Sequence, residues 1–167
     1  MKIRIFFSFL FIISIQAISY SQIKWMSFND AIKENATNKR KKVFVDVFTD
    51  WCGWCKQMDK TTFQDPTIVE YMNKNFLAVK MNAEMKDTIV FNNFTWTNPN
   101  PMGNRSPHSI AKAMLNDEMS YPTFVMLDED FNRMDMQKGF KDSNFLKGYL
   151  EFYIYEKYKK EDEKKKN

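Results

Sequence analysis

Cysteine, histidine and glycine are all scarce in this chain. Its 167 residues include two cysteines, one histidine, four glycines and five prolines. A structural zinc site takes four ligands, mostly from Cys and His, so zinc is a weak alternative and we predict no metal ligands. A single cysteine pair also excludes a small fold held together by several disulfides. Few glycines and 16 phenylalanines favour regular structure around one well-filled core.

Long apolar runs are also missing, except for one at the N-terminus. Lys2 and Arg4 begin the chain, residues 5–18 are mostly apolar, and small residues follow up to Ser21. This pattern predicts a secretory signal peptide over residues 1–21. The run is shorter than the ~20 residues that span a bilayer, which favours cleavage. We therefore expect an exported protein, periplasmic in the first place, with secretion or an uncleaved membrane-anchoring signal as alternatives.

The positive charge is concentrated at the C-terminal end. Residues 157–167 hold six lysines against three acidic residues, in a chain whose formal net charge is +4. Between the signal peptide and this tail, residues 22–156 form a domain that is close to neutral. Nucleic-acid binding needs a basic face on the folded domain, so no such partner is expected. We predict a charged, disordered tail, with contact to a membrane surface or a partner as the alternative.

The spacing of apolar residues predicts alternating helices and strands. The helices are expected to begin at Ser27 (ending near Asn38), at the cysteine pair, at Asp65–Pro66, at Ser106–Pro107 and at Asp142 or Ser143. The strands are expected at residues 43–48, 76–82, 123–127 and 134–140. Alternation followed by a hairpin predicts an α/β fold, with a central mixed sheet flanked by helices on both faces.

One acidic residue interrupts the first expected strand. Residues 43–48 are apolar on both faces except for Asp46, which falls between two phenylalanines. A buried carboxylate is costly and is retained only for a reason. The alternative is that Asp46 lies at a strand end and faces water.

Both cysteines lie in the motif W-C-G-W-C, residues 51–55, at the expected start of a helix. Free N–H groups and the helix dipole there favour an anion, which lowers the pKa of the first thiol. Cys52 is then an exposed nucleophile, and Cys55 is a buried thiol that resolves the mixed disulfide. A disulfide that closes so short a loop contributes little stability. An inert local disulfide and a zinc site are the weaker alternatives.

Residues 45–56, V-D-V-F-T-D-W-C-G-W-C-K, resemble the strand, turn and active-site helix of the thioredoxin superfamily. Residues 23–83 are similar to exported thioredoxin-like proteins and to the C-terminal domain of membrane thiol:disulfide interchange reductases. The resemblance is looser over residues 106–155 and does not cover 84–105. It implies a thioredoxin-like fold with an insert before the strand that follows the cis-proline.

The resemblance also implies roles for individual residues. Asp46 corresponds to a buried acid that moves the proton of the resolving cysteine, and Lys80 to the lysine beside it, although Lys80 could equally be exposed. Pro122 corresponds to a proline whose preceding peptide bond is cis and which faces the Cys52–Cys55 disulfide. The backbone of Tyr121 would then pair with an extended substrate.

The two tryptophans of the motif are expected to form an apolar rim for substrate, although plain packing is the alternative, more so for Trp51 than for Trp54. The pair Gly53-Trp54 departs from the Gly-Pro common in reducing thioredoxins, which leaves the direction of electron flow open. His108 has no partner at a useful spacing and is predicted to lie at the surface.

Residues 84–105 form the expected insert. Phe91, Phe94 and Trp96 occur there among Asn and Thr, and residues 98–101, N-P-N-P, interrupt any regular element. Structureless loops longer than about 12–15 residues are usually functional or disordered, and three aromatic residues argue against disorder. We predict a cap beside the active site that narrows the choice of substrate.

The sequence as a whole predicts an exported thiol–disulfide oxidoreductase that needs no cofactor. Its expected partners are substrate proteins with disulfides or thiols and a membrane redox partner. Reduction is favoured by the resemblance, with oxidation and isomerisation left open. The alternative from another class is a redox-inert, thioredoxin-like binding or chaperone-like module with a static Cys52–Cys55 disulfide.

Overall fold

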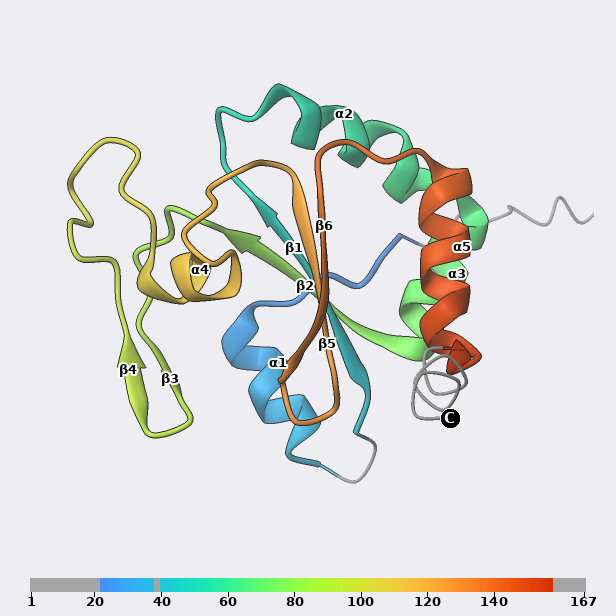
Figure 1. Cartoon of the computed structure of the whole chain (residues 1–167), viewed down its shortest axis with the longest axis horizontal. Coiled ribbons are helices and arrows are strands. Elements are labelled where there is room, and N and C mark those ends of the chain that lie inside the picture. Colours follow the sequence, from blue (N-terminus) through green and yellow to red (C-terminus); the bar gives the residue numbers. More distant parts are fainter. Residues whose placement is uncertain (1–21, 38–39, 158–167) are drawn as a thin grey trace, which may run out of the picture.

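A four-stranded mixed sheet forms the centre of the computed structural model, which describes residues 22–37 and 40–157 (Figure 1). The strands run in the order β2-β1-β5-β6. Their bounds are β1 Lys42–Phe48, β2 Phe76–Asn82, β5 Thr123–Leu127 and β6 Arg133–Lys138. Strand β1 pairs in parallel with β2 and antiparallel with β5, which pairs antiparallel with β6. This is the mixed sheet that the sequence predicts. The expected signal peptide, the residues of the expected tail from 158 onward and Asn38 lie outside the described residues.

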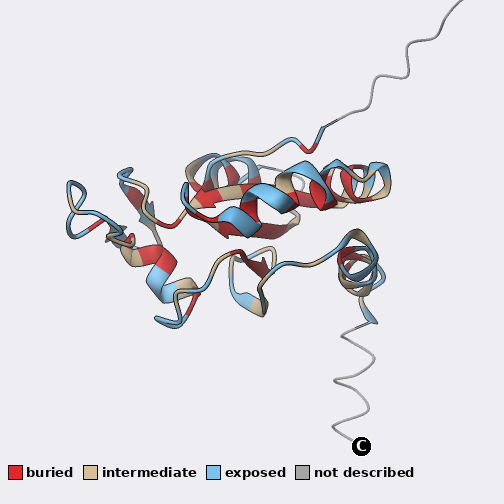
Figure 2. Ribbon diagram, turned by 90° about the horizontal axis from the view of Figure 1, so that it is seen from above, coloured by how far each residue is buried: buried red, intermediate tan, exposed pale blue. Residues whose placement is uncertain are grey.

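Helices cover both faces of this sheet (Figures 1 and 2). Their bounds are α1 Phe28–Asn35, α2 Gly53–Lys60, the 3-10 helix η1 Thr62–Gln64, α3 Pro66–Asn75, α4 Ser109–Met114 and α5 Ser143–Ile154. On β1, Val43, Val45 and Val47 pack into the core with α1 and α4. Phe44, from the opposite face, packs into a second core with α2, α3 and α5. No helix in the described ranges is long and apolar enough to cross a membrane.

Side-chain caps fix where the helices begin. Ser27 accepts a hydrogen bond from the backbone N–H of Asp30, and Asp142 accepts one from that of Phe145. Asp65 caps α3, with Pro66 as the first helical residue. Because each cap satisfies an N–H group that the helix itself leaves free, these residues end the preceding turn and start the helix. The three starts predicted from the sequence are confirmed, with Asp142 rather than Ser143 as the last cap.

The insert contains a small hairpin that the sequence analysis missed. Strands β3, Ile89–Phe91, and β4, Phe94–Trp96, pair antiparallel and lie apart from the main sheet (Figure 1). Asn92 and Asn93 connect them with φ values of 51° and 62°. Asparagine is among the few residues that adopt this left-handed conformation readily, and two such residues suit a tight hairpin. The Asn-Asn pair was the available signal.

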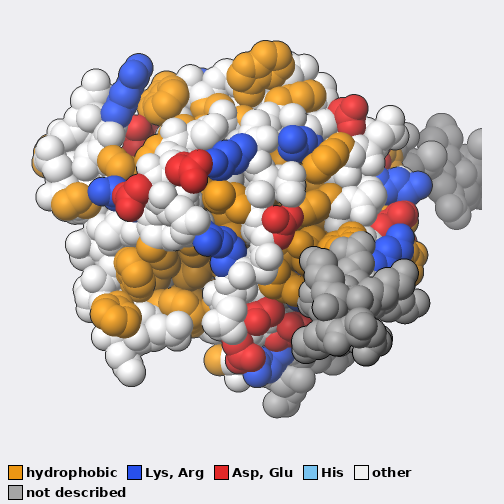
Figure 3. All heavy atoms as spheres, viewed as in Figure 1, with side chains coloured by type: hydrophobic (Ala, Val, Ile, Leu, Met, Phe, Trp, Pro, Cys, Tyr) orange, Lys and Arg blue, Asp and Glu red, His pale blue; other side chains and the backbone are white. Residues whose placement is uncertain are grey.

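The hairpin is anchored in the core at Ile89 and exposed near its turn. Ile89 is buried in the core beside α1. Val90 and Phe94 are each 66% exposed, and hydrophobic side chains gather over this part of the surface (Figure 3). Phe94 pairs with Phe91 and therefore lies on the same face as Ile89, so this face is covered at Ile89 and exposed near the turn.

The two ends of the insert meet at the main domain. The backbone N–H of His108 donates to the carbonyl of Ala83 at 2.7 Å. Helix α4 then begins at Ser109, later than the expected start at Ser106–Pro107. Its buried residues are Ile110 and Ala111, followed by Leu115 at the C-cap.

Candidate active site

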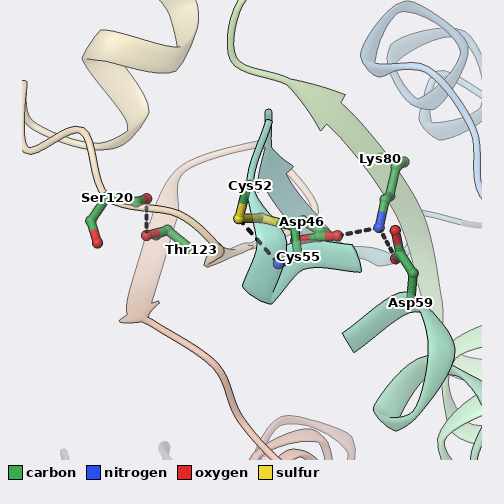
Figure 4. The surroundings of a disulfide bond; sticks show 7 residues. All are labelled: Asp46, Cys52, Cys55, Asp59, Lys80, Ser120 and Thr123. Atoms are coloured by element: carbon green, nitrogen blue, oxygen red, sulfur yellow. Dashed lines mark hydrogen bonds and ion pairs between the residues drawn. A yellow bond between two sulfur atoms is a disulfide. The ribbon is translucent and has the colours of Figure 1, made fainter. Parts of the chain in front are cut away.

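The cysteine pair lies where the central strand β1 passes into α2 (Figure 4). Cys52 is the N-cap of α2, and its Sγ accepts the backbone N–H of Cys55 at 3.1 Å. The two sulfurs form a disulfide, with the Cα atoms 5.3 Å apart. The N–H of Cys52 donates to the carbonyl of Thr49, which closes the turn after β1. The helix start predicted at the motif is confirmed.

Both sulfur-bearing residues are buried in this oxidised form. Cys52 is 5% exposed and Cys55 is 2% exposed. The prediction of an exposed Cys52 was therefore wrong for this state. The cause is the cap itself: Sγ of Cys52 turns back toward the first turn of α2, toward its disulfide partner and the Cys55 amide.

The start of α2 favours negative charge on sulfur. Its first turn carries no acidic side chain, so the backbone N–H groups face no competing carboxylate there. When the disulfide opens, a thiolate on Cys52 would lie against these N–H groups and the positive end of the helix dipole. Such an environment lowers a thiol pKa and raises the reactive fraction at neutral pH.

Asp46 is buried beneath this helix start, at 1% exposure, and Figure 4 shows it beside Cys55. One carboxylate oxygen, Oδ2, lies 2.6 Å from Nζ of Lys80, and the other, Oδ1, has no hydrogen-bond partner. Burial raises the pKa of Asp46 to about 6, against the opposing effect of Lys80. The alternative of an acid facing water is therefore wrong. A carboxyl group with this pKa can accept or give a proton near neutral pH.

Lys80 joins the buried acid to a second carboxylate near the surface. Its ammonium group forms an ion pair with Asp59 as well as with Asp46. It also lies 5.0–5.2 Å from the ring centroids of Trp25, Phe48 and Phe63. Negative ring faces attract a cation at this distance. Lys80 is thus fixed beside the acid, with its side chain 18% exposed.

Sequence reasoning missed Asp59. It follows Cys55 by four residues on α2, so the two side chains lie on one face of the helix. That spacing was the available signal. The side chain of Asp59 is 42% exposed, so the Asp46–Lys80–Asp59 series runs from the buried acid to solvent.

A turn on the other side of the disulfide carries Tyr121 and Pro122, and their peptide bond is cis. The hydroxyl of Thr123 donates to the carbonyl of Ser120 at 2.7 Å and closes this turn. Figure 4 shows Ser120 and Thr123 opposite the cysteine pair. The Tyr121 ring packs edge-on against Trp51, with centroids 5.7 Å apart. Burial raises the pKa of Tyr121 to about 12, and nearby Glu84 adds to this effect.

The motif tryptophans are both at the surface. Trp51 is 49% exposed and Trp54 is 63% exposed. The Trp54 ring lies 5.5 Å from that of Phe140, a partner that sequence reasoning did not identify because the residue was assigned to a strand. Two exposed aromatic rings next to a cysteine pair are the kind of apolar surface that marks an interaction site.

His108 is fully buried, so its predicted surface position was wrong. Its Nδ1 accepts the backbone N–H of Ile110, and its Nε2 lies 2.8 Å from the carbonyl of Asp87. The ring therefore caps α4 and ties the insert to that helix. Within residues 22–37 and 40–157, no group of three or more His, Cys, Asp or Glu is placed to hold a metal ion.

These contacts predict a pH-dependent stability that depends on His108. Burial lowers its pKa below the ordinary value, and the contact with Asp87 only partly opposes this. Below about pH 6.5 the imidazole of His108 is protonated in the unfolded chain but still neutral in the folded one. The free energy of unfolding therefore falls as the pH decreases. The slope cannot exceed about 1.4 kcal/mol per pH unit for one group.

Urea unfolding of the wild type and of His108→Asn, from pH 7.5 to 5, measures this effect. Asparagine keeps a capping oxygen but does not titrate, so the variant should lack this component of the slope. Equal slopes in the two proteins would contradict the prediction.

Comparison with known proteins agrees with this geometry. Residues 14–98 match a family model described as Thioredox_DsbH, a protein of unknown function, DUF255. A thiol:disulfide interchange protein DsbD of Haemophilus influenzae (strain PittEE) is 24% identical over 139 residues, which cover 82% of this chain and 20% of that protein. Spermatogenesis-associated protein 20 of Mus musculus is 25% identical over 71 residues, which cover 42% of this chain and 9% of that protein. The chain thus spans a fifth or less of these relatives.

Solved structures show the same fold. A DsbH oxidoreductase matches with a TM-score of 0.52 at 16% identity, covering 77% of this chain and 83% of that one. A thioredoxin from Thermus thermophilus matches with a TM-score of 0.58 at 15% identity, covering 80% of this chain and 88% of that one. A protein from Bacteroides thetaiotaomicron that is provisionally named a disulphide isomerase matches with a TM-score of 0.55 at 22% identity. The match covers 79% of this chain and 91% of that one. The chain therefore has the thioredoxin fold and belongs to the Thioredox_DsbH family.

Proposed function

We propose that this chain is an exported thiol–disulfide oxidoreductase that reduces or exchanges disulfides in exported proteins. Residues 22–156 would form its domain, with 1–21 as a signal peptide and 157–167 as a charged tail. The observation that carries the proposal is the Cys52–Cys55 disulfide at the start of α2, above the buried Asp46. The family match and the DsbD relatives support the reaction class.

In the reducing direction, the Cys52 thiolate attacks one sulfur of a substrate disulfide. A bond forms between Sγ of Cys52 and that sulfur, and the second substrate sulfur leaves as a thiolate that takes up a proton. Asp46 removes the proton from Cys55, whose thiolate then attacks Sγ of Cys52. The first substrate sulfur leaves and is protonated, so the substrate gains two electrons and two protons and the enzyme ends as the disulfide. Lys80 keeps the carboxylate in place, as its contacts with Asp46 and Asp59 support.

The substrate would lie across the rim. Trp51 and Trp54 offer apolar contacts, and the backbone of Tyr121, before Pro122, offers hydrogen bonds to an extended segment. The DsbD relatives support a thiol–disulfide redox partner. We infer a membrane reductase, because an exported dithiol that works as a reductant must be reduced again after each turnover. The scheme uses no metal or organic cofactor.

The burial of both sulfurs favours a second candidate, a redox-inert binding or chaperone-like module. A disulfide that is 5% and 2% exposed at its two ends is poorly placed for attack. In that case the exposed Trp51 and Trp54 would serve only as a binding surface. Reactivity separates the two candidates.

Alkylation of the reduced protein tests the proposal. At pH 6 iodoacetamide should label Cys52 quickly and Cys55 slowly, because only the thiol at the helix start is held as a thiolate. Mass spectrometry of the digested protein assigns each label. Slow and equal labelling of both cysteines would instead favour the inert module.

The reduction potential decides the direction of electron flow. Equilibration of the Cys52–Cys55 pair with glutathione or dithiothreitol buffers measures it. A value of about −270 mV would indicate a reductant, and one of about −120 mV an oxidant. We expect the lower value.

A further inference from the structure

Trp51 is held by both ends of the insert. Its indole Nε1–H donates to Oε1 of Glu84 at 2.9 Å, and the guanidinium carbon of Arg105 lies 4.8 Å from the ring centroid. Tyr121 packs edge-on against the same ring. Glu84 and Arg105 are the first and last residues of the insert, so a segment remote from the motif in sequence surrounds the side chain next to Cys52.

Arg105 is a cation without a partner of opposite charge. Among the described residues, the Trp51 ring is the one side-chain partner of its guanidinium. The other described arginines have polar partners. Arg40 forms an ion pair with Asp130, and Arg133 donates hydrogen bonds to the carbonyl of Met114 and the side chain of Asn116. A guanidinium that stacks on a ring keeps the N–H donors at its edge free, and these match a carboxylate.

The other charges near the motif leave Arg105 unpaired. Asp50 and Lys56, which flank the motif, are both exposed and carry opposite signs. Glu84 is bonded to the indole and forms no ion pair with Arg105. These four charges sum to zero, so the capacity to bind an anion lies with the unpaired Arg105 guanidinium itself, which is exposed over the Trp51 ring.

We propose that the insert makes the active site selective for substrates that carry a carboxylate beside the reacting cysteine. Arg105 binds this carboxylate, and Glu84 keeps Trp51 in the position on which Arg105 stacks. A peptide that brings a sulfur to Cys52 passes over Trp51, where an Asp or Glu one or two residues from its cysteine meets the guanidinium. The inference rests on the proposed disulfide exchange.

Matched peptide disulfides test this selectivity. Three peptides of one length carry Glu, Gln or Lys two residues from the cysteine, and stopped-flow fluorescence follows their reduction by the reduced full-length protein. An exposed ion pair of this kind should favour Glu over Gln by about two- to fivefold at low ionic strength. The Lys peptide should be slowest, and 0.5 M salt should remove most of the preference.

Variants locate the preference. Arg105→Gln should react equally with the Glu and Gln peptides, because the guanidinium that distinguishes a carboxylate from an amide is gone. Arg105→Lys should keep part of the preference, because it retains charge but not the planar stack. Lys86→Gln is the matched control, because it removes an exposed charge from the same insert. The partners of Trp51 are Glu84, Arg105 and Tyr121, so this change leaves its contacts in place.

The outcomes separate this inference from the function beneath it. Equal wild-type rates on the three peptides, or an unchanged preference in Arg105→Gln, would overturn the selectivity while the enzyme remains active. No reaction with any peptide would overturn both the selectivity and the proposed function. A loss of preference in Lys86→Gln as large as that in Arg105→Gln would also overturn it, by assigning the effect to net charge.

Discussion

Cys55→Ser should accumulate as a covalent complex with its substrate, and Cys52→Ser should lose disulfide exchange entirely. Sγ of Cys52 accepts the Cys55 amide at the start of α2, so it is the sulfur that can attack as a thiolate. Without Cys55 nothing resolves the mixed disulfide. Non-reducing gels with insulin as substrate show the trapped species, and turbidity after reduction of insulin measures the rate.

The two serine variants control for each other. Each removes the same disulfide, and so loses the same stabilisation of about 2 kcal/mol by the loop-entropy estimate for so short a loop. Circular dichroism should therefore show similar folding for both. Activity that survives in Cys52→Ser, or no trapped complex in Cys55→Ser, would reject the assigned order of attack and favour the inert module.

Asp46→Asn should make the protein slower and more stable at the same time. The proton of Cys55 then has no buried acceptor, and loss of a general base typically lowers a rate on the order of 10²-fold or more. The step affected is resolution, so the mixed disulfide should persist longer. Single-turnover kinetics from pH 5 to 8 measure this step.

The gain in stability comes from removing a buried charge. The folded-state pKa of Asp46 is raised to about 6, above the unfolded value. Between about pH 4 and 6 the folded chain binds a proton that the unfolded chain has lost, so wild-type stability falls as pH rises. Above this window the variant should be more stable by up to about 3 kcal/mol, and below pH 4 the two proteins should agree.

Asp59→Asn is the matched control for this experiment. It also removes one carboxylate from Lys80, but from a side chain that is 42% exposed. Solvent screens such a charge, so its removal should change stability far less. Asp59→Asn with the larger stability gain, or Asp46→Asn with wild-type resolution, would contradict the role given to Asp46.

The sequence was sufficient for the parts of this site that lie on regular elements. Asp46 was recognised as buried because its strand is apolar on both faces, and Cys52 as a helix start because an amphipathic pattern follows it. Pro122 was placed by family resemblance. In each case local pattern and global packing agree, which is the condition for sequence-based prediction to succeed.

Contacts made through the insert could not be predicted in this way. Trp51 meets Glu84 and Arg105 only because a long irregular segment returns to the motif. Turn patterns say little about where such a segment packs. The position of His108 was predicted wrongly for the same reason. Its partners are a backbone carbonyl and a backbone amide, which every residue type can offer, so the sequence does not reveal them.

The hydrogen bond between the backbone groups of His108 and Ala83 holds the two ends of the insert together. The two ends of the insert lie next to each other, so the distance that the insert must close is the same whatever its length. Doubling a flexible loop costs only about 0.6 kcal/mol in closure entropy. Segments of other lengths could thus be accommodated between these two points without altering the strand that carries Asp46, provided that a side chain still fills the place of Ile89 in the core.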